Sequence, residues 1–185
     1  ADDFAVFVLA EPLANVPNAK IITEEMLRKL EADHASLAIT GYGVYQDMCL
    51  AQNLPTNCSA DSSNFPKSTQ PRSIQMDLTS YAGIVAKYGE GLVDLQTVKD
   101  HIFVISDFKN GPCSGDSGGS TTAMVNGEEY YLGTTPTGFW SGYTCGASGP
   151  SWTPYTVGYT APVYKFLDLI NEAEDYVATH PVATH

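Results

Sequence analysis

The dipeptide Asn126-Gly127 constrains the fold of this chain more than any other short feature. The run before it is STTAMV and the run after it is EEYYLG, and both contain β-branched, aromatic or aliphatic residues that suit strands. Asn-Gly forms the tight turn that joins two antiparallel strands, because both residues tolerate a positive φ. The sequence therefore predicts a β-hairpin at this point and an antiparallel sheet around it.

Further runs also have the composition of strands, and turn-forming residues separate them. The chain has 16 Gly and 11 Pro, and its strand-like runs do not alternate with helices. An antiparallel barrel or sandwich is therefore favoured over a doubly wound sheet. The runs are 4–10, which reads as a fully buried strand, 35–45, 72–81, 101–108 and 152–163.

Two segments have helical signals. In 23–32 (TEEMLRKLEA), Thr23 can cap the N-terminus and two glutamates lie in the first turn. In 162–181 (PVYKFLDLINEAEDYVATHP), Pro162 fits the first turn and Pro181 ends the helix. The apolar face expected for this terminal helix consists of Val163, Phe166, Leu167, Ile170 and Ala173.

The composition limits the classes of partner. The 185 residues suit one domain of ordinary size, or one and a fraction, and 43% hydrophobic residues are enough for a packed core. The chain carries 21 Asp and Glu against 9 Lys and Arg, a net charge of -12, which argues against nucleic acid and against anionic membrane surfaces. No apolar run is long enough to span a membrane, and the first residues lack the pattern of a signal peptide.

The four cysteines, Cys49, Cys58, Cys113 and Cys145, show no metal-binding spacing with one another or with histidine. We therefore expect no metal and no cofactor. An even count in a polar chain fits two disulfides and an oxidising compartment, with free buried thiols as the alternative. Three pairings exist, of which we expect the nearest-neighbour one, Cys49–Cys58 and Cys113–Cys145. Asn57 begins a formal glycosylation sequon, which is a weak signal.

A glycine-rich cluster, Gly115-Asp116-Ser117-Gly118-Gly119, surrounds one serine and fits two nucleophile patterns. The first is the G-x-S-x-G elbow, which requires a helix directly after the serine. Here the next residues lead into the predicted hairpin, so this pattern does not fit. The second is G-D-S-G-G preceded by a cysteine.

The stretch CSGDSGG, followed by a strand, an Asn-Gly hairpin and a terminal helix, resembles the chymotrypsin-like (trypsin-family) serine proteases. The resemblance implies that Ser117 is the nucleophile. It also implies that the backbone N–H groups of Gly115 and Ser117 form the oxyanion hole. Asp116 would pair with the ammonium of a newly cut N-terminus, so the resemblance further implies activation from a zymogen.

The likeness covers nearly the whole chain from Asp3 onward. DFAVFVLAEP resembles the family's strand that begins at the triad aspartate, here Asp3. ITGYG resembles the strand that opens the second barrel, HIFVISDFKNGPC resembles a wall of the specificity pocket, and GYT (158–160) precedes the terminal helix. Cys113 and Cys145 match the disulfide that braces this pocket, and TPTG (135–138) falls where the family's substrate-pairing strand lies.

The implied fold is all-β: an antiparallel six-stranded barrel, the second barrel of a chymotrypsin-like double barrel, with a C-terminal α-helix. Residues 1–14 would be the last strand of a first barrel otherwise absent here. Residues 15–36 would be the connector with its short helix, 37–161 the second barrel, and 162–180 the terminal helix.

The pocket residues implied by the resemblance are Gly111, Pro112, Ser114, Val157 and the Pro136-Thr137-Gly138 segment. Gly111 stands at the pocket base where a trypsin-like enzyme has Asp, so selectivity for Lys or Arg is not expected. A branched Val157 on the wall favours small or medium apolar side chains. Pro136-Thr137-Gly138 replaces the usual Ser-Trp-Gly, and Gly138 keeps the approach needed for strand pairing with a substrate.

The family's triad histidine would precede Asp3, and none of His34, His101, His180 and His185 has its setting. A serine hydroxyl is a poor nucleophile without an adjacent base. We therefore expect a secreted serine endopeptidase whose histidine comes from a separate N-terminal chain carrying the first barrel. Peptides or proteins would be its substrates, and protein inhibitors would be further partners. The alternative is a non-catalytic protease homologue that acts by binding.

Overall fold

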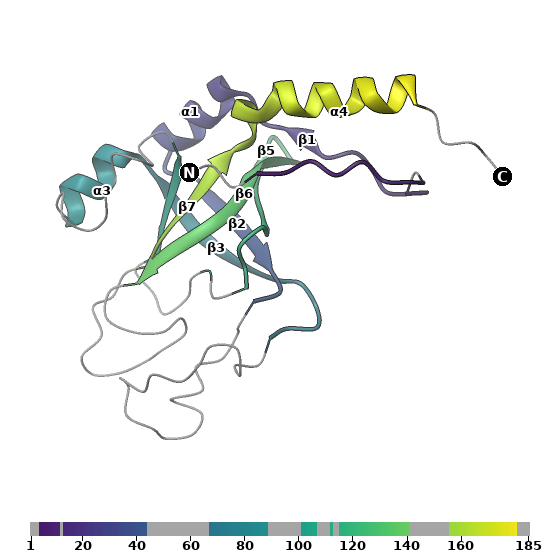
Figure 1. Ribbon diagram of the computed structural model, residues 1–185. Coiled ribbons are helices and arrows are strands. Elements are labelled where there is room, and N and C mark those ends of the chain that lie inside the picture. The colour runs from purple at the N-terminus through teal and green to yellow at the C-terminus, as the bar shows by residue number, and fades with distance from the viewer. Residues whose placement is uncertain are drawn as a thin grey trace.

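The computed structural model describes residues 4–11, 13–43, 67–88, 101–106, 112, 115–140 and 156–180. Its centre is a closed antiparallel β-barrel with a helix at its C-terminal end (Figure 1), which confirms the predicted fold class. The strands follow one another around the barrel as β6-β5-β2-β3-β4-β7, and pairing of β7 with β6 closes it. These strands are β2 (Ser36–Gly41), β3 (Arg72–Thr79), β4 (Ile102–Ser106), β5 (Ser120–Val125), β6 (Glu128–Trp140) and β7 (Thr156–Pro162).

The predicted hairpin joins β5 and β6. Asn126 has φ 53° and Gly127 has φ 82°, so both turn residues adopt the left-handed backbone that the Asn-Gly signal predicts. Val125 pairs with Glu128 directly across this turn. The expected strand regions 35–45, 72–81, 101–108 and 152–163 contain β2, β3, β4 and β7 respectively.

The long strand β6 pairs with both β5 and β7, and its pairing with β7 is interrupted once. Thr134 pairs with Ala161 and Thr137 pairs with Tyr159, so Thr135 and Pro136 together lie opposite Thr160. Two residues facing one is the geometry of a β-bulge. Pro136 has no N–H to give to a sheet, which suits it to this position.

The barrel interior is aliphatic, because alternate residues of each strand point inward. In β2 the buried positions are Leu37, Ile39 and Gly41, with less buried residues between them. The first helix and the start of the last one close the barrel with apolar side chains. The core cluster comprises Ile22, Leu27, Leu37, Ile39, Met76, Leu78, Ile102, Val104, Ala123, Leu132 and Val163.

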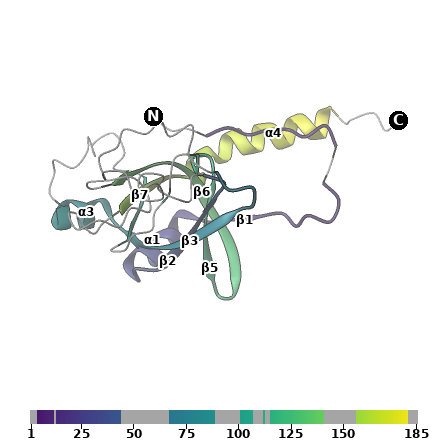
Figure 2. The ribbon, with the colours of Figure 1, turned by 90° about the horizontal axis from the view of Figure 1, so that it is seen from below.

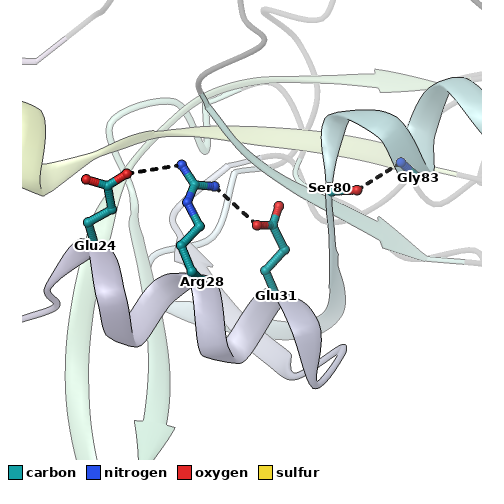
Figure 3. Close-up of polar contacts among 5 residues, drawn as sticks. All are labelled: Glu24, Arg28, Glu31, Ser80 and Gly83. Atoms are coloured by element: carbon teal, nitrogen blue, oxygen red, sulfur yellow. Dashed lines mark hydrogen bonds and ion pairs between the residues drawn. The ribbon is translucent and has the colours of Figure 1, made fainter.

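Helix α1 (Glu24–Ala32) forms where the sequence predicts it. The Met26 N–H donates to Thr23 Oγ1 at 3.2 Å, so Thr23 is the predicted N-cap. Leu27 is buried in the core, while Arg28 pairs on the exposed side with Glu24 at 3.4 Å and Glu31 at 3.1 Å (Figure 3). Exposed pairs of this spacing each contribute a few tenths of a kcal/mol, about 0.3–0.5.

Helix α3 (Tyr81–Tyr88) was not expected, because the alternation in 72–81 suggests that the strand continues to Tyr81. The strand instead ends at Thr79, and Ser80 starts the helix by accepting a hydrogen bond from the Gly83 N–H at 2.9 Å (Figure 3). Ile84 anchors the helix in the interior, since its side chain is fully buried.

Residues 4–10 correct one expectation. They were expected to be a fully buried strand, but they form no strand, and the Phe7 side chain is 84% exposed. Within the described residues no strand pairs with them, and a strand cannot be buried without neighbours on its faces. The segment instead runs beside the last helix (Figures 1 and 2), where Phe4 stacks on Phe166 with ring centroids 4.2 Å apart.

The short strand β1 (Lys20–Ile21) follows this segment and pairs in parallel with Tyr130 and Tyr131 of β6. An ion pair between the side chains of Lys20 and Glu128 joins the same two strands. This pairing was not expected, because a strand of two residues leaves no periodic pattern in the sequence.

The C-terminal helix begins differently from the prediction. Pro162 is the last residue of β7, and Val163–Phe166 form a 3₁₀ turn before α4 (Leu167–Thr179). Of the expected apolar face, Val163 is buried in the barrel, whereas Leu167 is exposed. None of the described helices is long and apolar enough to cross a membrane.

Candidate active site

Ser117 lies in the tight loop that leads into β5, and its side chain is exposed. Two glycines give this loop its shape. Gly115 has φ +95° and Gly118 has φ +82°, a backbone conformation that strains residues with a Cβ. The glycines on both sides of the serine therefore have a local reason, independent of any activity, to be glycine.

Backbone hydrogen bonds hold the loop in place. The Gly119 N–H donates to the Asp116 carbonyl at 2.9 Å, which closes the turn around Ser117. The Gly118 N–H donates to the Thr135 carbonyl at 2.8 Å, and the Thr135 N–H donates to the Gly119 carbonyl at 2.9 Å. The serine loop is thus fixed to the bulged residue of β6.

The carboxylate of Asp116 turns toward the end of β2. Its Oδ1 accepts a hydrogen bond from the Gly43 N–H at 2.7 Å. A Cβ at Gly41 would lie 2.2 Å from this oxygen, and a Cβ at Gly43 would lie 2.6 Å from it. The two glycines of ITGYG therefore mark a close approach of a side chain, as glycines inside a strand suggest.

A cavity of about 500 Å³ opens beside Ser117. The serine loop forms one side, and the ends of β2 and of the segment before β3 form the other. The exposed aromatic ring of Tyr42 lies at this second side. The cavity is lined by Thr40, Gly41, Tyr42, Pro71 and residues 115–120. An exposed hydroxyl on a fixed loop beside a concave surface is an arrangement that can present a nucleophile to a bound chain.

The described histidines lie elsewhere. His34 is an exposed turn residue with φ 49°. His101 is buried before β4 and lines a separate cavity of about 10 Å³ beside α1. His180 ends α4 and stacks on Tyr176. Among these described residues, no histidine lines the cavity beside Ser117.

The predicted pocket residues are described in part. Pro112 is buried, and Pro136-Thr137-Gly138 lie on β6 next to β7, where Gly138 pairs with Gly158 and Phe139 with Val157. The structure thus places the backbone of two predicted pocket segments on neighbouring strands. Asp3, Gly111, Ser114, Asn57, His185 and all four cysteines lie outside the described residues, so both disulfides and the aspartate remain predictions.

Sequence reasoning gave no site role to several residues that the structure places there. Tyr42 and Pro71 line the cavity, and Thr135 supports the loop through its backbone. The glycines on either side of Tyr42 were a signal that this end of β2 meets another segment. Thr135 falls in the TPTG segment of the resemblance, but its hold on the serine loop could not be predicted, because it depends on a bulge between strands distant in sequence.

No group of metal-binding side chains occurs in the part of the chain that the structure describes. A comparison with protein-family models finds no match, and a comparison with the sequences of curated proteins finds none either.

Proposed function

We propose that the chain is the nucleophile-bearing part of a secreted serine endopeptidase of the chymotrypsin-like kind. The observation that carries the proposal is the exposed Ser117 on a loop fixed by hydrogen bonds beside a cavity of about 500 Å³. Ser117 Oγ attacks a peptide carbonyl while a base takes its proton, and the C–N bond breaks as the base returns that proton to the amine. Water then hydrolyses the acyl ester and regenerates the serine.

The base is a histidine on a separate N-terminal chain, oriented by Asp3. In support, none of the described histidines lines the cavity beside Ser117. The segment after Asp3 also exposes large apolar side chains to solvent: Phe7 is 84% exposed and Leu13 is 64% exposed. Exposed apolar side chains gathered in this way mark an interface more often than a free surface.

Helix α4 adds to the same surface. None of its residues is buried, although Ile170, Ala173 and Val177 face the segment 6–9 across a groove of about 490 Å³. A helix gains most of its stability by packing an apolar face, so this face needs a partner. The first barrel of the N-terminal chain would cover both the segment and the helix.

Asp116 links activity to zymogen activation. Its carboxylate is half-buried and already bonded to the Gly43 N–H, so it is fixed next to the serine loop. In the proposed active form it accepts the ammonium of a newly cut N-terminus. That pair would hold the N–H groups of Gly115 and Ser117 toward the substrate carbonyl.

The side chain before the cleaved bond would be small or medium-sized and apolar. Gly111 at the pocket base offers no carboxylate for Lys or Arg, and Pro112, Ser114 and Val157 would form the walls. The substrate backbone would pair with Thr137 and Gly138 on β6. A panel of peptides varied at this position checks this preference.

A fluorophosphonate probe tests the proposed reaction on the purified protein. Ser117 Oγ forms a bond to phosphorus and fluoride leaves, so intact mass and peptide mapping locate the adduct. We expect one adduct on Ser117, none in Ser117→Ala, and normal labelling in Ser73→Ala, because Ser73 is an exposed serine on β3 that does not line the cavity. Absence of an adduct on the wild-type protein would leave the chain as a binding homologue.

A further inference from the structure

Three buried threonines from neighbouring strands bond to one another behind the serine loop. Thr121 of β5, Thr135 of β6 and Thr160 of β7 are 0%, 1% and 0% exposed. The hydroxyl oxygens of Thr121 and Thr135 lie 3.0 Å apart, and those of Thr121 and Thr160 lie 2.8 Å apart. Thr121 is the central member, because its hydroxyl contacts both of the others.

The three hydroxyls lie where the strand pairing is interrupted. Thr135 and Pro136 lie opposite Thr160 in the bulge between β6 and β7. The β5–β6 pairing also shifts between Thr121 and Thr122. Bulges disrupt the local ladder of backbone hydrogen bonds, and the threonine hydroxyls connect the three strands at this place through their side chains.

Thr135 connects this network to Ser117. Its carbonyl accepts from the Gly118 N–H at 2.8 Å and its N–H donates to the Gly119 carbonyl at 2.9 Å. The backbone of Thr135 therefore holds the serine loop while its hydroxyl holds the network. Thr121 supports the same loop from its other end, since it follows Ser120 on β5.

We propose that Thr121, Thr135 and Thr160 are positioning residues that set the orientation of Ser117 through the bulge of β6. This inference rests on the proposed function. The Thr121 hydroxyl has one proton and two lone pairs, so it can bond to both neighbours, either by donating to one of them or by accepting from both. Valine has nearly the same shape but leaves both neighbouring hydroxyls buried without that partner, which is the costly way to break a network.

The test compares Thr121→Val with Thr121→Ser, which restores the hydroxyl, and with Thr79→Val, the same change at a buried threonine on β3 outside the network. Fluorophosphonate labelling is measured over a range of probe concentrations, which separates the maximal rate from probe affinity. We expect Thr121→Val to lower the maximal rate about tenfold, the equivalent of ~1.4 kcal/mol in the barrier. The affinity for the probe should stay unchanged, and Thr121→Ser should recover most of the maximal labelling rate.

Thr79→Val should leave the labelling rate unchanged, because Thr79 lies on β3 and takes no part in the hydroxyl contacts of Thr121. Equal loss of rate in Thr79→Val, or a wild-type rate in Thr121→Val, would overturn the positioning role. If Thr121→Val does not fold, Thr160→Val removes the peripheral hydroxyl and gives the same comparison.

A second measurement does not depend on activity. Hydrogen exchange of the Gly118 amide reports directly on its bond to the Thr135 carbonyl. We expect faster exchange of this amide in Thr121→Val and not in Thr79→Val. Failure of wild-type labelling would contradict the proposed function, whereas unchanged Gly118 exchange would contradict the network's hold on the loop.

Discussion

At the scale of single residues, the site depends on contacts that leave no room for a methyl group. A Cβ at Gly43 would lie 2.7 Å from the Asp116 amide nitrogen as well as from its carboxyl carbon. Real Cβ atoms do not approach other atoms so closely, and a backbone nitrogen cannot rotate away. Gly43 therefore fixes how Asp116, and with it the serine loop, packs against β2.

Gly43→Ala should lower the free energy of unfolding by about 1–3 kcal/mol, the usual cost of overpacking, and should also suppress labelling of Ser117. Gly127→Ala is the matched control, because its Cβ would meet no atom within 4 Å. Its only cost is that of a Cβ on a backbone with positive φ. Urea denaturation and probe labelling measure both effects. Normal labelling in Gly43→Ala would show that the Asp116 contact does not matter for the loop.

The residue scale also shows what the sequence could reveal of the site. The glycines of the site meet backbone requirements. Gly115 and Gly118 have positive φ angles, and Gly43 lies too close to Asp116 to carry a Cβ. The supporting threonines could not be recognised, because Thr121, Thr135 and Thr160 look like ordinary strand residues. Only the register of three strands brings their hydroxyls together.

At the scale of elements, local signals were sufficient where a turn or cap is made by neighbouring residues. Asn126-Gly127 and Thr23 are of this kind, and the structure has the hairpin and the helix that they predict. Helix α3 was not predicted, because it contains Gly83 and directly follows an alternating run that suggests a strand as far as Tyr81. Strand β1 was not predicted, because its partner is more than 100 residues away on β6.

Strand β6 also makes a prediction about pH. Tyr131, half-buried on this strand, has a pKa raised above its ordinary value because burial disfavours the phenolate. The unfolded chain therefore ionises at this tyrosine first. The stability that the neutral phenol contributes is present below about pH 10 and is lost as pH rises through the raised pKa.

Tyr131→Phe removes this ionisation and should make the free energy of unfolding fall less steeply above about pH 10. Urea denaturation at pH 8 and at a series of higher values measures the slope, with pH 8 as the reference for both proteins. Equal slopes for the two proteins would mean that ionisation of the Tyr131 phenol does not destabilise the folded protein.

At the scale of the whole molecule, the barrel buries its own core while the segment 4–9 and α4 keep apolar side chains exposed. The expectation of a buried strand at 4–10 was wrong for the chain by itself, and the reason is the absence of neighbouring strands among the described residues. Periodicity can show that a segment is apolar, but it does not show which polypeptide covers it. The proposal that the catalytic groups are divided between this chain and another rests on this exposed apolar surface.

The most direct test compares Ser117 labelling in the intact purified protein with labelling of the 19.9 kDa chain after separation and refolding. Circular dichroism on the refolded chain confirms the barrel before the probe is added. We expect a companion chain in the intact protein, an adduct on Ser117 there, and a rate at least a hundredfold lower, about 2.7 kcal/mol in the barrier, in the separated chain. Equal labelling of the separated, folded chain would contradict the proposed division of the catalytic groups, because Ser117 would then need no base from a partner.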